Sequence, residues 1–215
     1  MFDLHTHSLI SDGELLPSEI AARYAALGFK VIAITDHVDY SNIKSTVHSI
    51  LEFTKHWPKN SAIKVLPGIE LTHLPPNQFK PLARFARHAG IKIIVAHGQT
   101  LSEPVAKGTN FAALNSDIDI LAHPGNITPE ETLLAKKRNI FLEVTARTSH
   151  STCNKKIIAM ARKLCADLIL NTDSHSPCDI LTPLKLKQNA LKFGLSKNEI
   201  SEIYKKVSIF LKSIT

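Results

Sequence analysis

The chain has 215 residues, of which 44% are hydrophobic and 21% are charged, and its formal net charge is +7 at pH 7. This length and apolar content can bury one large core, so we expect a single domain spanning residues 1–215. Only four residues precede His5, and no apolar stretch reaches the roughly 20 residues that cross a bilayer, so we expect a cytoplasmic protein with no membrane partner. The positive charge is typical of proteins that bind phosphates, but many lysines and arginines fall on predicted outer helices, which favours solvated surfaces and makes a nucleic-acid partner the weaker expectation.

Short apolar runs alternate with helical patterns along the whole chain. This alternation is typical of βα units and a parallel sheet, so the predicted class is α/β. The runs are rich in Val, Ile and Leu, as buried parallel strands are. The seven predicted strands are residues 2–5, 31–35, 63–69, 91–96, 118–122, 140–144 and 168–172.

The predicted helices between these strands have recognisable boundaries. The first begins near Pro17 and ends at Gly28. A capping box, in which a threonine or serine and a glutamate three residues later exchange hydrogen bonds, is predicted at 128–131 and again at 196–199. The final helix carries an apolar stripe that should pack on the body of the protein.

Six of the seven predicted strands end in a histidine or a carboxylate. An open doubly wound sheet would give a similar strand pattern, but its sites gather at one switch point between two strands. A ring of strand ends that face one centre explains six sites better, so we expect a distorted (β/α)7 TIM-like barrel with a metal site at the C-terminal rim of the strands.

The candidate ligands are weak signals one at a time and a strong signal together. His5 and His7 are two residues apart, so both rings can project to the same side of an extended segment. Asp12 precedes a glycine and could simply belong to a turn. His97 and His123 each follow an apolar strand directly, where a polar ring needs a partner.

The motifs HTH, SDG, ITDH, GIE, AHG, AHPG and TDSH occur in this order between residues 5 and 175. In this respect the chain resembles the PHP family, the polymerase and histidinol phosphatase superfamily, and in particular its compact histidinol phosphate phosphatase domain proteins. The resemblance implies a distorted seven-stranded barrel that holds three divalent metal ions, with zinc, manganese and iron as the candidates. It implies a first metal on His5, His7, Glu70 and Asp173, a second on Glu70, His97 and His123, and a third on Asp12, His37 and His175.

The resemblance also implies a reaction, namely hydrolysis of a small phosphomonoester such as histidinol phosphate by a metal-activated water. That bridging water would be held at Glu70, His97 and Asp173. Three divalent ions, three carboxylates and one hydroxide leave about two positive charges, which suits a phosphomonoester dianion.

Three other functions stay open at this stage. One is a phosphodiesterase or nuclease that acts on nucleic acid or nucleotides, and another is a non-catalytic interaction domain that metals stabilise. A dinuclear amidohydrolase-like site shares the HxH motif, but it would need a bridging lysine that is absent from the end of the fourth predicted strand. The oligomeric state is not predicted.

The sixth predicted strand ends without a ligand from the family set. Glu143, Thr145 and Arg147 follow there instead. Arg147 is a candidate substrate-binding residue, because a guanidinium can clamp a phosphate oxygen, although a surface ion pair explains it equally well. His73 and His150 are weaker candidates as proton donors, with solvent-facing positions as the expectation for both.

The remaining histidines and the cysteines are not expected to take part in the site. His48, His56 and His88 fall on helical segments and are expected to be exposed or structural. The three cysteines, Cys153, Cys165 and Cys178, form no CxxC pair and are expected to be reduced thiols.

Overall fold

All seven predicted strands are present in the structure, a computed structural model that describes residues 1–214. They lie in the order β1, β2, β4, β5, β6, β7, β8, and every neighbouring pair is parallel. Their bounds are β1 (Phe2–Asp3), β2 (Val31–Ile34), β4 (Lys64–Leu71), β5 (Ile93–His97), β6 (Ile120–Ala122), β7 (Phe141–Thr145) and β8 (Leu168–Asn171). The short strand β3 (His37–Val38) was not predicted, because a two-residue strand leaves no periodicity to detect; it pairs with β4.

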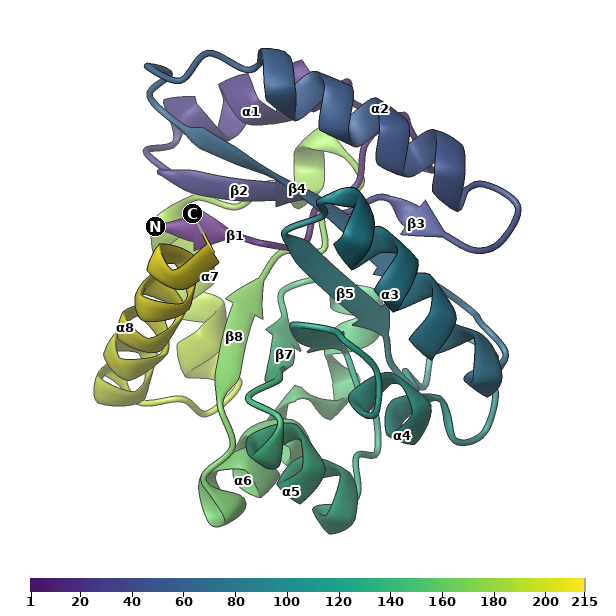
Figure 1. Cartoon of the computed structure of the whole chain (residues 1–215). Coiled ribbons are helices and arrows are strands. Elements are labelled where there is room, and N and C mark those ends of the chain that lie inside the picture. The colour runs from purple at the N-terminus through teal and green to yellow at the C-terminus, as the bar shows by residue number, and fades with distance from the viewer. Residues whose placement is uncertain (215) are drawn as a thin grey trace.

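The sheet closes on itself between its first and last strands. A parallel bridge joins Thr6 to Ser174, just beyond β1 and β8. Two backbone hydrogen bonds flank it, from the Asp173 N–H to the His5 carbonyl (3.1 Å) and from the His7 N–H to the Ser174 carbonyl (2.8 Å). The result is the predicted α/β fold, a nearly closed barrel of seven parallel strands with helices between them (Figure 1).

A buried polar network supports this closure. The carboxylate of Asp3 accepts hydrogen bonds from the hydroxyls of Thr172 (2.6 Å) and Tyr24 (2.9 Å). Burial raises the pKa of Asp3 to about 6, although these hydrogen bonds oppose the shift. Asp3 therefore connects β1, α1 and the end of β8 inside the barrel.

The helices cover the outside of the strands. Both predicted capping boxes are present, at Thr128 with Glu131 and at Ser196 with Glu199. The first helix begins at Pro17 as predicted. The helix bounds are α1 (Pro17–Ala26), α2 (Ile43–His56), α3 (Phe79–Ala89), α4 (Thr109–Leu114), α5 (Pro129–Lys137), α6 (Asn154–Leu164), α7 (Pro183–Lys192) and α8 (Lys197–Ile214), with short 3-10 helices η1 (Pro76–Gln78), η2 (Thr148–Cys153) and η3 (Pro177–Asp179).

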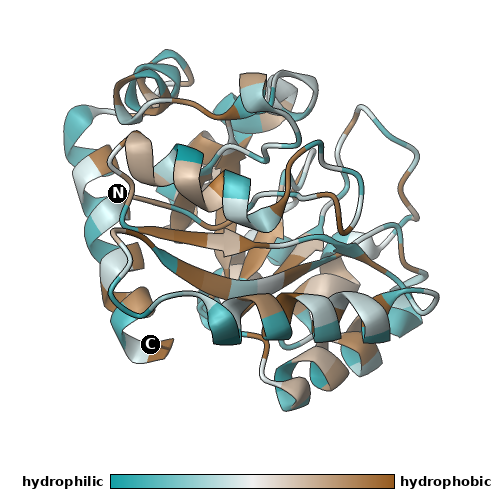
Figure 2. Ribbon diagram, turned by 90° about the horizontal axis from the view of Figure 1, so that it is seen from above, coloured by the Kyte–Doolittle hydropathy of each residue, from teal (hydrophilic) through white to brown (hydrophobic). Residues whose placement is uncertain are grey.

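Hydrophobic residues concentrate on the strands and on the inner faces of the helices, while hydrophilic residues lie outside (Figure 2). The buried core runs from Phe2 in β1 to Leu211 in α8. The apolar stripe of α8, with Ile203 and Val207, is buried as predicted. Within residues 1–214, none of the helices has the length and apolar composition needed to cross a membrane.

Candidate metal centre

The barrel rim at the C-terminal ends of the strands gathers all nine predicted ligands. Glu70 and His97 lie near the ends of β4 and β5, and the others lie in the segments beyond the strand ends, so the side chains meet over the barrel mouth. Three of the nine, His5, His7 and Glu70, are fully or almost fully buried beneath a cavity of about 510 Å³. The other six line that cavity: Asp12, His37, His97, His123, Asp173 and His175.

The deepest cluster joins two imidazoles to two carboxylates. His5 Nε2 lies 3.4 Å from Glu70 Oε2 and 3.6 Å from Asp173 Oδ1. His7 Nε2 lies 3.6 Å and 3.3 Å from the same two oxygens. These four donor atoms therefore face one another across a common centre.

A second group lies nearer the solvent. Asp12 Oδ1 is 3.5 Å from His37 Nε2 and 3.5 Å from His175 Nε2. The two ring nitrogens are 3.3 Å apart. The ring of His7 packs against those of both His37 and His175, with centroids 4.1 Å and 4.0 Å away, so this group adjoins the deeper one.

His97 has neighbours that the sequence did not indicate. Its Nε2 lies 3.1 Å from Glu103 Oε2, and the same oxygen lies 2.9 Å from His73 Nε2. His123 faces both halves of the site, because its Nε2 is 3.8 Å from Glu70 Oε1 and its ring makes an edge contact with that of His97 at 4.5 Å. The four groups of side chains that could each hold a metal ion are His7, Asp12, His37 and His175; His5, His123 and Asp173; His5, His7 and Glu70; and His73, His97 and Glu103.

Several buried polar atoms in the rim have no hydrogen-bond partner. They are His5 Nε2, both ring nitrogens of His7, both carboxylate oxygens of Glu70 and His123 Nδ1. Elsewhere in residues 1–214 the same condition is found only at Asn154 Oδ1 and Tyr204 Oη. Buried polar atoms are almost always paired, so this concentration indicates a binding site for a group that completes them.

Glu143 is a buried carboxylate whose contact with His5 the sequence did not reveal. It lies in β7, fully buried, and its Oε1 is 2.8 Å from His5 Nδ1. Its other oxygen accepts a hydrogen bond from the backbone N–H of His123, and Asn171 donates to Oε1. A proton held on Nδ1 by Glu143 leaves His5 Nε2 free as a lone-pair donor toward Glu70 and Asp173.

The buried carboxylate of Asp36 shapes the loop that carries Asp12. It accepts hydrogen bonds from the Ser8 backbone N–H (2.8 Å), the Ser8 hydroxyl (2.7 Å) and the Ser11 hydroxyl (2.7 Å). Asp36 therefore binds within the protein rather than facing the cavity. Ser11 directly precedes Asp12, so these hydrogen bonds fix the backbone beside Asp12.

The buried carboxylates around His5 favour a positive charge in the deep cluster. Burial lowers the pKa of His5, but Glu143, Asp173 and Glu70 outweigh burial and raise that pKa well above its usual value. Burial raises the pKa of Asp173 well above its usual value, and Glu70 adds to the shift while His5 opposes it. The cluster thus attracts positive charge, which a proton on His5 or a metal ion could supply.

Arg147 lies at the cavity edge, half-buried, and lines the cavity. Its Nη1 donates a hydrogen bond to the Asp173 carbonyl (3.0 Å) and contacts His175 Nδ1. The side chain is therefore held beside the cluster rather than pointing into bulk solvent.

The expectation for His150 was wrong. Its side chain is 5% exposed, because the 3-10 helix η2 turns it back under the loop after β5. His73 is half-exposed, and His48, His56 and His88 are exposed as expected. All three cysteines are free.

Strained backbone also concentrates at the rim. Within residues 1–214, five non-glycine residues have positive φ, and three of them are His73 (50°), His123 (29°) and Asp173 (54°). Such conformations cost about 1–3 kcal/mol each and are found mainly at functional sites.

Comparison with known proteins agrees with this geometry. The sequence matches the family model for the PHP domain over residues 3–176. It is 40% identical over 204 residues to an uncharacterized protein of Methanocaldococcus jannaschii, a match that covers 93% of this chain and 92% of that protein.

Solved structures with a similar fold include two whose functions differ. One is histidinol phosphate phosphatase from Lactococcus lactis, solved with zinc, L-histidinol and phosphate, with a TM-score of 0.63, 17% identity, and coverage of 91% of this chain and 94% of that one. The other is a chain of an archaeal ribonuclease P bound to mature tRNA, with a TM-score of 0.68, 14% identity, and coverage of 96% and 89%. Because the PHP domain model matches most of the sequence and the rim carries the motifs of that family, the chain belongs to the PHP domain family.

Proposed function

We propose that this protein, acting as one domain, is a metal-dependent phosphohydrolase that cleaves a small phosphomonoester, with histidinol phosphate as the named candidate. The observation that carries this proposal is the set of buried, unpaired donor atoms on His5, His7 and Glu70. Three divalent ions, of zinc, manganese or iron, would complete them. The proposed ligands are His5, His7, Glu70 and Asp173 for the first ion, Glu70, His97 and His123 for the second, and Asp12, His37 and His175 for the third.

The spacing of the donor atoms fits metal ions of this size. A tetrahedral zinc ion with donors at about 2.0–2.1 Å separates those donors from one another by about 3.3–3.4 Å. The nitrogens and oxygens of the deep cluster are 3.3–3.6 Å apart. Those of Asp12, His37 and His175 are 3.3–3.5 Å apart.

When bound, divalent metals would supply positive charge for phosphoryl oxygens and would lower the pKa of water toward neutrality. The residues of the chain do the positioning. Glu143 holds the ring of His5 in one tautomer and orientation, and Asp36 holds the loop of Asp12. Arg147 is proposed to donate hydrogen bonds to a phosphate oxygen at the cavity edge, which its planar guanidinium suits.

The charge and size of the site favour a monoester. Six positive charges on three divalent ions exceed the three carboxylates Asp12, Glu70 and Asp173, which favours a dianion. The cavity of about 510 Å³ has the dimensions of a small-molecule site. Among the described residues that line it, none is lysine, which argues against the amidohydrolase-like alternative.

A phosphodiester in nucleic acid is the second candidate substrate. The fold is shared with a chain of an archaeal ribonuclease P, and the net charge of +7 would attract a polyanion. The same set of metal ligands could act on a diester. Only an activity assay can therefore distinguish the two candidate substrates.

The test uses protein reconstituted with zinc, manganese or iron. It compares an aryl phosphate monoester, a bis-aryl phosphate and a short single-stranded RNA. Faster hydrolysis of the monoester is the expected result, and a panel of metabolite phosphates then identifies the leaving group. Hydrolysis of the diester or RNA alone would support the second candidate. If protein that holds metal hydrolyses none of the three, the site is a non-catalytic metal scaffold.

A further inference from the structure

Three side chains outside the proposed ligand set meet beside His97. His73 follows β4, Glu103 lies in the loop after β5, and His150 lies in η2 after β7. All three line the same cavity as the proposed ligands. Glu103 is their common partner, because its Oε2 contacts His73 and His97, and its Oε1 lies 3.4 Å from His150 Nε2.

The hydrogen bond at Nδ1 of His97 fixes the tautomer of the ring and therefore decides whether Nε2 carries a lone pair. His97 Nδ1 lies 3.0 Å from the carbonyl of Gly98, which can only accept, so Nδ1 carries the proton. In the neutral ring Nε2 is then a lone-pair donor, and it faces a carboxylate oxygen at 3.1 Å. Two lone pairs at this distance need a proton or a metal ion between them, and one metal ion could take both atoms as ligands.

His73 is brought to this position by a backbone conformation that β-carbon-bearing residues rarely adopt. Its φ is 50°, and its ring lies 4.7 Å from that of His97. The conformation directs its Nε2 to within 2.9 Å of Glu103 Oε2. Such conformations are found mainly at functional sites.

The loop that carries Glu103 has a rigid base. A β-carbon on Gly125, whose φ is 62°, would lie 1.8 Å from the Gln99 carbonyl oxygen, so only glycine lets the two loops approach. Asn110 accepts a hydrogen bond from the Gln99 backbone N–H and donates one to the Pro124 carbonyl. The base is therefore fixed, while Glu103 farther along is partly exposed.

His150 fastens the middle of this loop. Its Nδ1 lies 2.8 Å from the hydroxyl of Thr100 and 2.8 Å from that of Ser102. Because His150 is nearly buried, these contacts hold the residues that directly precede Glu103. His150 is a positioning residue in this arrangement.

From this geometry we infer that His73 and Glu103 are additional ligands of the second proposed ion, where they join Glu70, His97 and His123, while His150 positions Glu103. The inference rests on the proposed function and adds to it, because it places one metal ligand, Glu103, on a loop. Loading of this ion would couple to closure of the loop between Gly98 and Gly108.

The first test is the number of metal ions bound per chain, measured by elemental analysis after dialysis at a fixed free zinc concentration. The wild type should hold about three. Glu103→Gln and His73→Asn should each lose one equivalent while keeping the wild-type circular dichroism spectrum. Glu202→Gln and His56→Asn, at exposed positions on α8 and α2, are the matched controls and should keep three. Retention of three ions by both loop variants would overturn the inference.

The second test is proteolysis at Lys107, an exposed residue of the same loop. Zinc should slow tryptic cleavage after Lys107 at least tenfold in the wild type and should have no such effect in Glu103→Gln. Equal protection of both proteins would contradict a role for Glu103. If the wild type holds three ions but hydrolyses no phosphomonoester, the proposed function fails and the ligand assignment stands; if the wild type binds no metal, both fail.

Discussion

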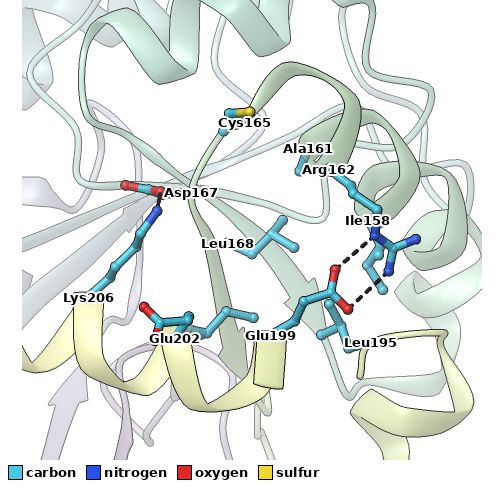
Figure 3. A pocket seen from close by; sticks show the side chains of 12 residues that line it. Ile158, Ala161, Arg162, Cys165, Asp167, Leu168, Leu195, Glu199, Glu202 and Lys206 are labelled. Carbon is cyan, nitrogen blue, oxygen red and sulfur yellow. Dashed lines mark hydrogen bonds and ion pairs between the residues drawn. The ribbon is translucent and has the colours of Figure 1, made fainter. Parts of the chain in front are cut away.

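Two regions of this protein hold charged side chains in opposite ways. At the rim, His5, His7 and Glu70 are buried and carry donor atoms without hydrogen-bond partners. At the outer seam between α6 and α8, Arg162 pairs with both oxygens of Glu199 at 2.8 Å and 3.1 Å, and Lys206 pairs with Asp167, around a small pocket (Figure 3). The seam is complete within the chain, whereas the rim is completed only by something that binds to it.

The difference extends to what each region contributes. The seam charges are partly exposed, so water screens them and their pairing adds little stability. The rim charges are screened much less, so removing one changes the whole cluster. Burial together with missing partners therefore identifies the functional region, and charge by itself does not.

The largest expected effect is from Glu70→Gln in the rim. Loss of a carboxylate that serves two proposed ions should lower kcat/KM for an aryl phosphate by about 10³-fold or more, as for removal of a main electrostatic group of an active site. Steady-state kinetics and metal analysis of the same preparation measure it. Glu199→Gln in the seam is the control and should retain full activity. Activity within tenfold of the wild type for Glu70→Gln would remove Glu70 from the site.

Removing the metals should lower the free energy of unfolding through the loss of contacts at the rim, with no contribution from the seam. Ions at about 100 times their dissociation constant add about 2.7 kcal/mol to the free energy of unfolding. For a chain of this size, that corresponds to a fall in Tm of about 5–10 °C on chelation. Differential scanning calorimetry with and without chelator measures the change. The Glu199→Gln variant should show the same fall, and a Tm that does not respond to chelator in the wild type would contradict a metal site.

Glu143→Gln tests the support of the rim rather than its ligands. Without the carboxylate, the proton on His5 Nδ1 is held less firmly, and such changes behind a metal ligand typically lower affinity or activity by about 10–100-fold. Metal titration monitored by calorimetry measures the affinity. Glu202→Gln removes a carboxylate of the same size from an exposed position and should leave the affinity unchanged. An unchanged affinity in Glu143→Gln would mean that His5 is oriented by packing instead.

Arg147→Lys should lower kcat/KM about tenfold while leaving the metal content intact, because lysine keeps the charge but loses the two-pronged hydrogen bonding of the guanidinium. Kinetics and elemental analysis together separate substrate binding from metal binding. Unchanged kinetics would remove Arg147 from substrate recognition, and a loss of metal would show that its contacts with Asp173 and His175 matter more.

The part of this site that could be predicted is the part encoded locally. A short apolar run predicts a strand, and the polar residue that ends it predicts a rim position. The full set of nine ligands, including Asp12 in a loop, followed only from the resemblance to the PHP family. Strand limits moved by one or two residues, since hydrogen bonds rather than hydropathy decide them.

The part that escaped prediction depends on contacts between distant segments. Glu143 is 138 residues from His5, and nothing in its own neighbourhood indicates the pairing. His150 was expected in a solvent-facing loop, but it lies in η2 and points inward. The partners of Glu103, His73 and His150, lie in the segments after β4 and β7. Such contacts form because closure of the barrel brings together loops that are far apart in the sequence, so no local sequence pattern predicts them.

The smallest effect is expected in the seam. The hydrogen bond from Arg162 lowers the pKa of Glu199 from its usual 4.5 to about 2. Because the folded-state pKa is the lower one, this pair contributes stability above about pH 4.5 and loses the contribution as the pH falls toward 2. Screening limits the contribution at this exposed position, so Glu199→Gln should lower Tm by at most about 2–4 °C at pH 7 and by less at pH 3. Thermal denaturation at both pH values measures this, and a larger loss at pH 3 than at pH 7 would contradict the assigned sign.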